Sequence, residues 1–231
     1  MLPLRDRLPT RSFPLVTVGL IIANFAVWIL YQLPQLEDSV DRLGLRPCEV
    51  AAICPTIGDP WPADGVTSMF AHGSWDHVLF NMLFLWIFGN NVEDALGRFR
   101  FLVFYLLCGW GADALQSWVT LQFGTAEDAT IPEIGASGAI AGVLGAYFVL
   151  HPRARVLTWV FPVFFLELPA WIFLGFWFLF QAWDGGWSVT HPQESGGVAY
   201  FAHIGGFLFG LVAVRVFMAG RPPQLEPGIA R

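Results

Sequence analysis

The sequence contains no lysine, and charged residues of both signs make up only 13% of its 231 residues. Soluble domains carry roughly a quarter charged residues, so this composition indicates a membrane protein. The formal net charge is −6, and most of the acidic side chains fall in loops. This charge balance indicates no nucleic-acid partner.

Cysteines and metal-binding motifs are also scarce. Cys48 and Cys54 share a long polar loop, where either a disulfide or two separate thiols fits the sequence, and Cys108 lies in an apolar run. There is no CxxC or HExxH motif, and His72 and His77 do not share a helix face. We expect neither a metal nor an organic cofactor.

Apolar residues, by contrast, are abundant: 55% of the chain is hydrophobic and 16% is aromatic. A transmembrane helix needs roughly 20 mostly apolar residues. The candidate spans are residues 14–33, 77–95, 100–122, 137–150, 156–182 and 199–218. They predict an all-α, polytopic membrane protein with six transmembrane helices. Its expected parts are an N-terminal segment (1–13), a membrane domain (14–218) with a long outer loop (34–76), and a tail (219–231).

The arginines predict the orientation of this bundle. Ten of the twelve lie before the first span, between spans two and three, between spans four and five, or near the end of the last span. Positive charge favours the cytoplasmic side. Both termini are therefore expected in the cytoplasm. The first span lacks a small-residue cleavage site, so we expect it to be a retained helix.

The fourth span is too short to cross the bilayer. It runs from Ser137 to Leu150, and its 14 residues cover roughly 21 Å of a hydrocarbon core of about 30 Å. The loop 123–136 must therefore descend to meet it. Irregular backbone at that depth requires surrounding protein or a water-filled cavity, so we expect Ser137 at the floor of a wet cavity.

Small residues predict that the fourth and sixth spans touch. Glycines recur at GxxxG spacing, which allows close helix contact in lipid. They are Gly138 and Gly142 in the fourth span and Gly206 and Gly210 in the sixth. This contact would bring Ser137 within reach of His203. A serine hydrogen-bonded to a histidine is the minimal activated nucleophile.

Other polar groups lie at a similar depth. His77 and Asn81 stand at i and i+4 on one helix face, and with the Ser137 backbone N–H at a helix N-terminus they could stabilise an oxyanion. Each residue taken singly also fits a structural role, in packing or in backbone hydrogen bonding. Asp113 either completes a triad with His203, pairs with Gln116, or lines the cavity.

Three motifs together resemble the rhomboid family of intramembrane serine proteases, of the basic bacterial six-helix type. They are 67-TSMFAHGSWDHVLFN-81 with 88-FGNNVEDALG-97, then 135-GASGA-139, then 202-AHIGG-206. The resemblance implies that Ser137 is the nucleophile and His203 the general base. It also implies that His77, Asn81 and the Ser137 amide form the oxyanion site.

The resemblance assigns two further roles and leaves one gap. It implies a structural role for His72 and a helix-tying role for Glu93. Many members of the family carry an aromatic residue that stacks on the catalytic histidine, where this chain has Ala141. We expect Phe201, Phe207 or an aromatic of the fifth span to replace it.

The expected function is that of an intramembrane serine endopeptidase. It would cleave peptide bonds in or near transmembrane segments of other membrane proteins, through an acyl-enzyme on Ser137. The expected location is a bacterial inner membrane, and the sequence indicates no oligomeric state. The segment 183–199 is a candidate cap over the cavity. Two rival functions are a non-enzymatic binding protein on the same bundle and a transporter.

Overall fold

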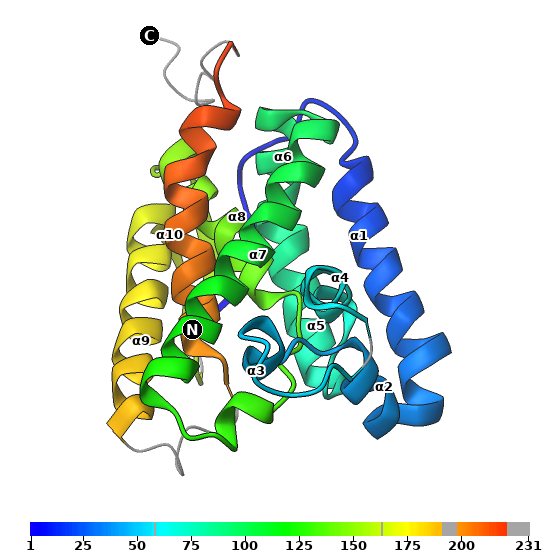
Figure 1. The fold of residues 1–231 in the computed structure, drawn as a ribbon. Coiled ribbons are helices and arrows are strands. Elements are labelled where there is room, and N and C mark those ends of the chain that lie inside the picture. The colour runs from blue at the N-terminus through cyan, green and yellow to red at the C-terminus, as the bar shows by residue number, and fades with distance from the viewer. Residues whose placement is uncertain (58, 163, 191–197, 221–231) are drawn as a thin grey trace, which may run out of the picture.

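A computed structural model describes residues 1–57, 59–162, 164–190 and 198–220 of the protein. The fold is mostly helical, with one three-stranded sheet of order β1-β2-β3. Six helical segments overlap the expected spans (Figure 1). They are α1 (Leu15–Ala26), continued by a π-helix (Val27–Gln32); α5 (Trp75–Phe84), a π-helix (Leu85–Gly89) and α6 (Asn90–Leu96) in series; α7 (Arg98–Phe123); α8 (Ser137–Leu150); α9 (Ala170–Thr190); and α10 (Tyr200–Phe217).

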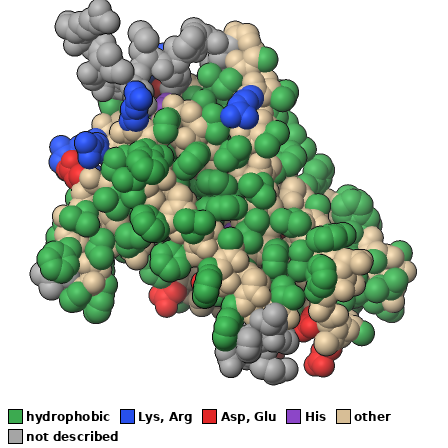
Figure 2. Space-filling model, turned by 90° about the vertical axis from the view of Figure 1, so that its left-hand side faces the viewer, with side chains coloured by type: hydrophobic (Ala, Val, Ile, Leu, Met, Phe, Trp, Pro, Cys, Tyr) green, Lys and Arg blue, Asp and Glu red, His purple; other side chains and the backbone are tan. Residues whose placement is uncertain are grey.

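The arrangement of these helices agrees with a membrane bundle. The beginning of α1 and the end of α10 lie at the same end of the bundle (Figure 1). Two described segments, Leu15–Leu43 and Tyr200–Phe217, are long and apolar enough to cross a membrane by length and composition. On the face in Figure 2, hydrophobic side chains cover the middle, arginines gather toward one end, and most of the visible acidic side chains lie toward the other.

Helix α8 lies inside the bundle and has the bounds expected of the fourth span. Residues Gly138–Tyr147 are all buried, and α8 contacts both α7 and α10. Its first residue, Ser137, is therefore held in the protein interior, and the polypeptide before it has to enter the bundle to reach it.

The expected fifth span, 156–182, is wrong in its first half. Residues Arg155–Val160 form strand β2 and Phe164–Pro169 form strand β3, and α9 begins only at Ala170. Pro162 and Pro169 explain the difference, because proline lacks the N–H that a helix interior needs and also restricts the residue before it. The β-branched and aromatic residues of β2 favour a strand.

The remaining strand of the sheet, β1, comes from the expected N-terminal segment. Strand β1 (Leu2–Asp6) pairs antiparallel with β2, and Arg7 forms an ion pair with Glu167. Asp6 accepts hydrogen bonds from Tyr147 Oη at 2.6 Å and from Asn91 Nδ2 at 2.5 Å. Burial raises the pKa of Asp6 from 3.8 to about 6, although the bond from Tyr147 opposes this rise.

Glu93 ties two helix ends together, as expected. Its carboxylate accepts hydrogen bonds from Val16 N at 3.0 Å, from Thr17 N at 2.7 Å and from Thr17 Oγ1 at 2.8 Å. These donors lie in the first turn of α1, where backbone N–H groups lack intrahelical partners. The carboxylate therefore caps α1 from α6.

The outer loop holds several short helices and one disulfide. They are α2 (Leu36–Leu43), α3 (Pro47–Val50), α4 (Trp61–Thr67) and two 3₁₀ turns, Leu33–Gln35 and Ser68–Phe70. The structure joins Cys48 to Cys54, which resolves the two alternatives left by the sequence.

The outer loop also positions the polypeptide that descends to Ser137. This descending segment, residues 124–136, contains one 3₁₀ turn, Asp128–Thr130. Leu45 and Glu133 exchange two backbone hydrogen bonds, of 3.1 and 2.7 Å. Gly135 N donates to Ser68 O at 2.9 Å. The backbone of the descending segment is thus hydrogen-bonded to protein, as irregular structure in a membrane requires.

Candidate active site

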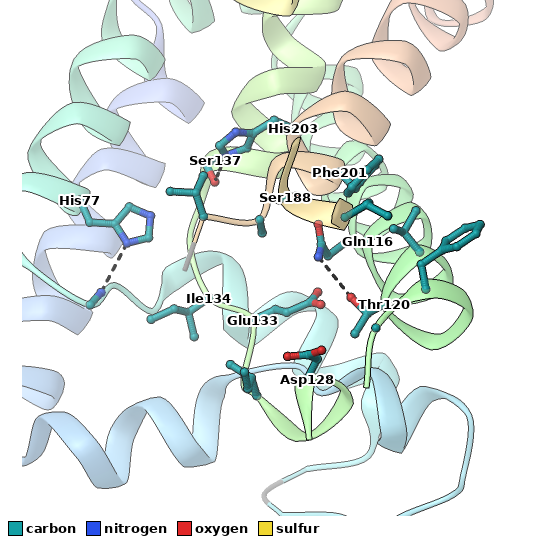
Figure 3. A pocket seen from close by; sticks show the side chains of 18 of the residues that line it. His77, Gln116, Thr120, Asp128, Glu133, Ile134, Ser137, Ser188, Phe201 and His203 are labelled. Carbon is teal, nitrogen blue, oxygen red and sulfur yellow. Dashed lines mark hydrogen bonds between the residues drawn. The ribbon is translucent and has the colours of Figure 1, made fainter. Parts of the chain in front are cut away.

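Ser137 and His203 form a hydrogen-bonded pair in the interior of the bundle. His203 Nε2 lies 2.8 Å from Ser137 Oγ, although the two residues are 66 positions apart (Figure 3). Ser137 is the first residue of α8, and His203 lies in the first turn of α10. The structure therefore brings together the two residues predicted to act as nucleophile and base.

Glycines create this proximity, as predicted from the GxxxG spacing. A Cβ on Gly206 would collide with the backbone carbonyl of Gly138, and a Cβ on Gly210 would collide with the backbone of Gly142. The two helices cross with backbone against backbone, the close approach that small residues allow.

The second ring nitrogen of His203 contacts a residue that sequence reasoning missed. His203 Nδ1 lies 2.6 Å from Gln181 Oε1 on α9. Gln181 is the only side chain with a carbonyl oxygen in the apolar run 170–183. A polar group within a span is a functional candidate by default, so the sequence marked Gln181 as a candidate without indicating its partner.

An aromatic residue of the fifth span also stands beside His203. The ring centroid of Trp177 lies 6.0 Å from that of His203, at an interplanar angle of 37°. Ala141, where the family resemblance leads one to expect an aromatic, is buried beside α10, and its Cβ would lie 3.3 Å from a Cβ on Gly206. Trp177 is therefore the aromatic of the fifth span that stands beside His203, and its role as the substitute stays a prediction.

His77 faces Ser137 from the first turn of α5. Ser74 caps this helix by accepting a hydrogen bond from His77 N at 3.1 Å. His77 Nδ1 accepts a long hydrogen bond from Gly73 N, at 3.5 Å, which leaves Nε2 as the protonated nitrogen of a neutral ring. A Cβ on Gly135 would lie 2.7 Å from His77 Nε2 and 3.6 Å from Ser137 Oγ, so the imidazole edge lies close to the serine (Figure 3).

Gly135 has a backbone conformation that fits this position. Its φ is +124°, a value that other residues rarely adopt. A side chain there would be strained and would also meet the His77 ring. The glycine thus allows the backbone to pass between His77 and Ser137.

Asn81 supplies a second donor beside the cavity. It is 7% exposed, and its Nδ2 has no hydrogen-bond partner among the residues that the structure describes. A buried donor without a partner costs about 1–3 kcal/mol, so such groups call for an explanation. The N-terminus of α8 also lacks a side-chain cap. Unpaired donors aimed at a reacting oxygen would explain both features.

A cavity of about 840 Å³ connects these groups. His77, Ser137 and His203 line it, together with Glu133 and Asp128 of the descending segment (Figure 3). Asn81 also lines it. Ser137 therefore faces a space large enough for a peptide segment and water, in agreement with the expected cavity.

Asp113 does not complete a triad in the described structure. The group that contacts His203 Nδ1 is Gln181. Gln116 is engaged elsewhere: its Nε2 donates to Thr120 Oγ1 at 3.3 Å, and its Oε1 accepts from Ala202 N at 3.1 Å. Of the three roles considered for Asp113, the triad and the pairing with Gln116 are therefore not seen, and Asp113 is not among the described residues that line the cavity.

His72 is buried, and its contacts fit a structural role. Its backbone N–H donates to Gln32 Oε1 at 2.8 Å, and its carbonyl accepts from Gln32 Nε2 at 3.0 Å. Burial lowers the pKa of His72 from 6.5 to about 3. Its ring packs edge-on against His77, with centroids 4.9 Å apart, so His72 supports the position of the His77 ring.

The described residues do not test two of the expectations, the absence of a cofactor and the cap over the cavity. Within the described ranges, no group of three His, Cys, Asp or Glu side chains could hold a metal ion, and the absence of a cofactor stays a prediction. Of the candidate cap 183–199, residues up to Thr190 continue α9, and residues 191–197 lie outside the described part of the chain.

The Rhomboid domain family model matches residues 62–220, a range that contains all of these site residues. The chain belongs to the rhomboid family. Three rhomboid relatives illustrate the likeness. The chain is 31% identical over 196 residues to Rhomboid protein 1, mitochondrial, of Saccharomyces cerevisiae; 27% over 199 residues to the human presenilin-associated rhomboid-like protein, mitochondrial; and 30% over 141 residues to rhomboid protease AarA of Providencia stuartii.

These matches cover 84%, 84% and 57% of this rhomboid chain, but only 51%, 46% and 49% of the relatives. The chain thus spans about half the length of the curated relatives it matches. Rhomboids are membrane-embedded proteins, and the mostly helical fold agrees with this. The relatives named come from mitochondria and from a bacterium, so the expected bacterial inner membrane stays a prediction.

Proposed function

We propose that this rhomboid is an intramembrane serine endopeptidase in which Ser137 is the nucleophile and His203 the general base. The observation that carries the proposal is the 2.8 Å contact between Ser137 Oγ and His203 Nε2 at the cavity. One relative is named a rhomboid protease, and family membership supports the same activity.

The proposed acylation step uses this pair. Ser137 Oγ forms a bond to the carbonyl carbon of the scissile peptide as its proton moves to His203 Nε2. The carbonyl oxygen becomes an oxyanion beside His77 Nε2–H, Asn81 Nδ2 and the N-terminus of α8. The carbon–nitrogen bond then breaks, and the proton on His203 passes to the leaving amine. An ester on Ser137 remains.

Deacylation uses the same groups with water as the nucleophile. Water gives a proton to His203 Nε2 and attacks the ester carbon, and the ester bond to Ser137 Oγ breaks as that oxygen takes the proton back. The 840 Å³ cavity provides space for this water within the bundle. The step consumes only water and needs neither metal nor organic cofactor.

The substrates in this proposal are transmembrane proteins cleaved in or near a membrane-spanning segment. The lipid bilayer is the second partner, with both chain termini in the cytoplasm by the distribution of arginines. The cavity would then open toward the opposite side, where the acidic loops lie.

Cleavage of a single-span membrane substrate by the purified protein in detergent tests the proposal. Wild type should release two fragments, and Ser137→Ala and His203→Ala should release none above background. Cleavage that persists in both variants would point to a contaminating protease. A folded wild type that binds the substrate without cleaving it would favour the binding-protein alternative. Stoichiometric ligand binding that survives Ser137→Ala would favour the transporter.

A further inference from the structure

Gln181 contacts the proposed base of the dyad from a position outside the cavity. Its Oε1 lies 2.6 Å from His203 Nδ1, while the opposite ring nitrogen lies 2.8 Å from Ser137 Oγ. Gln181 itself is not among the described residues that line the cavity. A substrate in the cavity would therefore touch Ser137 and His203 but not Gln181.

The chemistry of this contact fixes the proton on one nitrogen. An amide oxygen only accepts hydrogen bonds, so His203 Nδ1 must be the protonated nitrogen to pair with Gln181 Oε1. In the neutral ring, Nε2 then has a free lone pair directed at the Ser137 hydroxyl. With the other tautomer, Nε2 would carry the proton and could not accept one from Ser137.

We propose that Gln181 is the positioning residue that selects the tautomer and orientation of His203 in which Nε2 acts as base. This inference rests on the proposed protease function and deepens it. Gln181 stands where a triad enzyme has a carboxylate. As a neutral amide it orients the ring without a full negative charge beside the imidazolium.

The place of Gln181 on α9 gives the contact a second consequence. Near Gln181 the outward face of α9 is apolar and exposed: Phe176, Leu179, Phe180 and Trp183 are 51–74% exposed. The bond to His203 is thus a polar tie from an otherwise apolar stretch of helix to α10. His203 is held in its reactive orientation only while α9 lies against α10.

Steady-state cleavage by Gln181→Met, with Leu179→Met as a matched control, tests the proposal. Both variants place methionine on α9, but Leu179 is 62% exposed and faces away from the dyad. We expect Gln181→Met to lower kcat by about tenfold or more with KM nearly unchanged. The Leu179→Met variant should match wild type. Equal kcat values in Gln181→Met and wild type would overturn the proposal.

Gln181→Glu supplies a readout that a purely structural role would not change. Glutamate keeps the shape and the acceptor, and its negative charge would favour the imidazolium. The acid limb of the kcat/KM profile should move to higher pH by about one unit. The other ionisable groups around the cavity, His77, Asp128 and Glu133, are the same in both proteins. An acid limb at the wild-type pH would contradict a contact with Nδ1.

Nitrogen-15 NMR of the histidine rings tests the tautomer without any substrate. The His203 signals, assigned by their loss in His203→Ala, should show protonated Nδ1 in wild type and an increased Nε2-protonated population in Gln181→Met. The same tautomer in both proteins would overturn the inference even if the enzyme is a serine protease. Loss of cleavage in Ser137→Ala separately verifies the proposed function, so failure of either claim can be recognised.

Discussion

The backbone carbonyl of Gly138 on α8 occupies the space that a side chain on Gly206 of α10 would need. Gly138 follows Ser137 directly, and Gly206 lies about one helical turn beyond His203. The contact between the glycines therefore sets the separation between Ser137 and His203, the proposed nucleophile and base.

Gly206→Ala should push α8 and α10 apart near the dyad. A backbone carbonyl cannot rotate away as a flexible side chain can, and overpacking of this kind typically costs about 1–3 kcal/mol of stability. We expect a lower thermal midpoint in detergent. We also expect the fractional loss of cleavage activity to be larger than the fractional loss of stability. Gly175→Ala on α9, where a Cβ meets nothing within 4 Å, should leave both almost unchanged. Equal effects of the two substitutions would contradict this role for the glycine contact.

Local sequence patterns predicted the helices and the Ser137–His203 pair, because each of these features has a recognisable pattern in the sequence. The bounds of α8 followed from an apolar run between Ser137 and the His151-Pro152 pair, and the glycine spacing predicted the α8–α10 contact. The β2–β3 hairpin was missed because hydrophobicity alone carried the fifth span across Pro162 and Pro169. Strand β1 could not be predicted locally, since it depends on pairing with β2 about 150 residues away.

In the candidate site, too, local sequence patterns did not predict features that depend on how distant segments pack. His77, Asn81, Ser137 and His203 lie in motifs, but Gln181 does not. Its role depends on the rotation of α9 against α10, which a single amide in an apolar run does not reveal. The orphan Nδ2 of Asn81 is likewise visible only once burial and hydrogen bonds are known.

Asn81→Ala should remove one donor from the proposed oxyanion site. Loss of one such donor in other enzymes lowers kcat by about 10²–10³-fold. We expect a decrease of that order here, while Ser137 still reacts in part with a small fluorophosphonate, because the Ser137–His203 contact is kept. Parallel rate and labelling measurements check this. An undiminished rate would remove Asn81 from the mechanism.

Glu93→Ala should destabilise the bundle at the end away from the dyad. Its carboxylate is 2% exposed and accepts three hydrogen bonds from the start of α1. Hydrogen bonds to charged groups contribute roughly 1.5–3 kcal/mol each, so we expect a loss of a few kcal/mol in unfolding free energy. Asp94→Ala is the matched control, because among the described residues the Asp94 carboxylate accepts only exposed bonds, from Arg11 and Ser12. A Glu93→Ala protein as stable as Asp94→Ala would refute the capping role.

Asp6 should make the free energy of unfolding fall as pH rises, which is the opposite of the usual effect of a carboxyl group. Its pKa in the folded protein, about 6, lies above the ordinary 3.8 because of burial. The folded state therefore holds this proton more tightly than the unfolded state does. The stabilising contribution of Asp6 to the free energy of unfolding is full below about pH 4 and is lost as pH rises through about 6. The thermal midpoint of wild type relative to Asp6→Asn should fall between pH 4 and pH 7.

Asp128 provides a control of opposite sign. Hydrogen bonds from the backbone and side chain of Thr125 lower its pKa below 3.8, so its contribution is present above that pH and is lost in stronger acid. Asp128→Asn should thus be less stable than wild type at neutral pH and nearly equal to it in acid. A difference between wild type and Asp6→Asn that does not vary with pH would show that Asp6 titrates normally.

Mass spectrometry after reaction with a fluorophosphonate tests most directly whether His203 activates Ser137. We expect a single covalent adduct on the peptide that contains Ser137 in wild type, none in Ser137→Ala, and a strongly reduced yield in folded His203→Ala. An adduct on another serine, or labelling of equal yield without His203, would contradict the account.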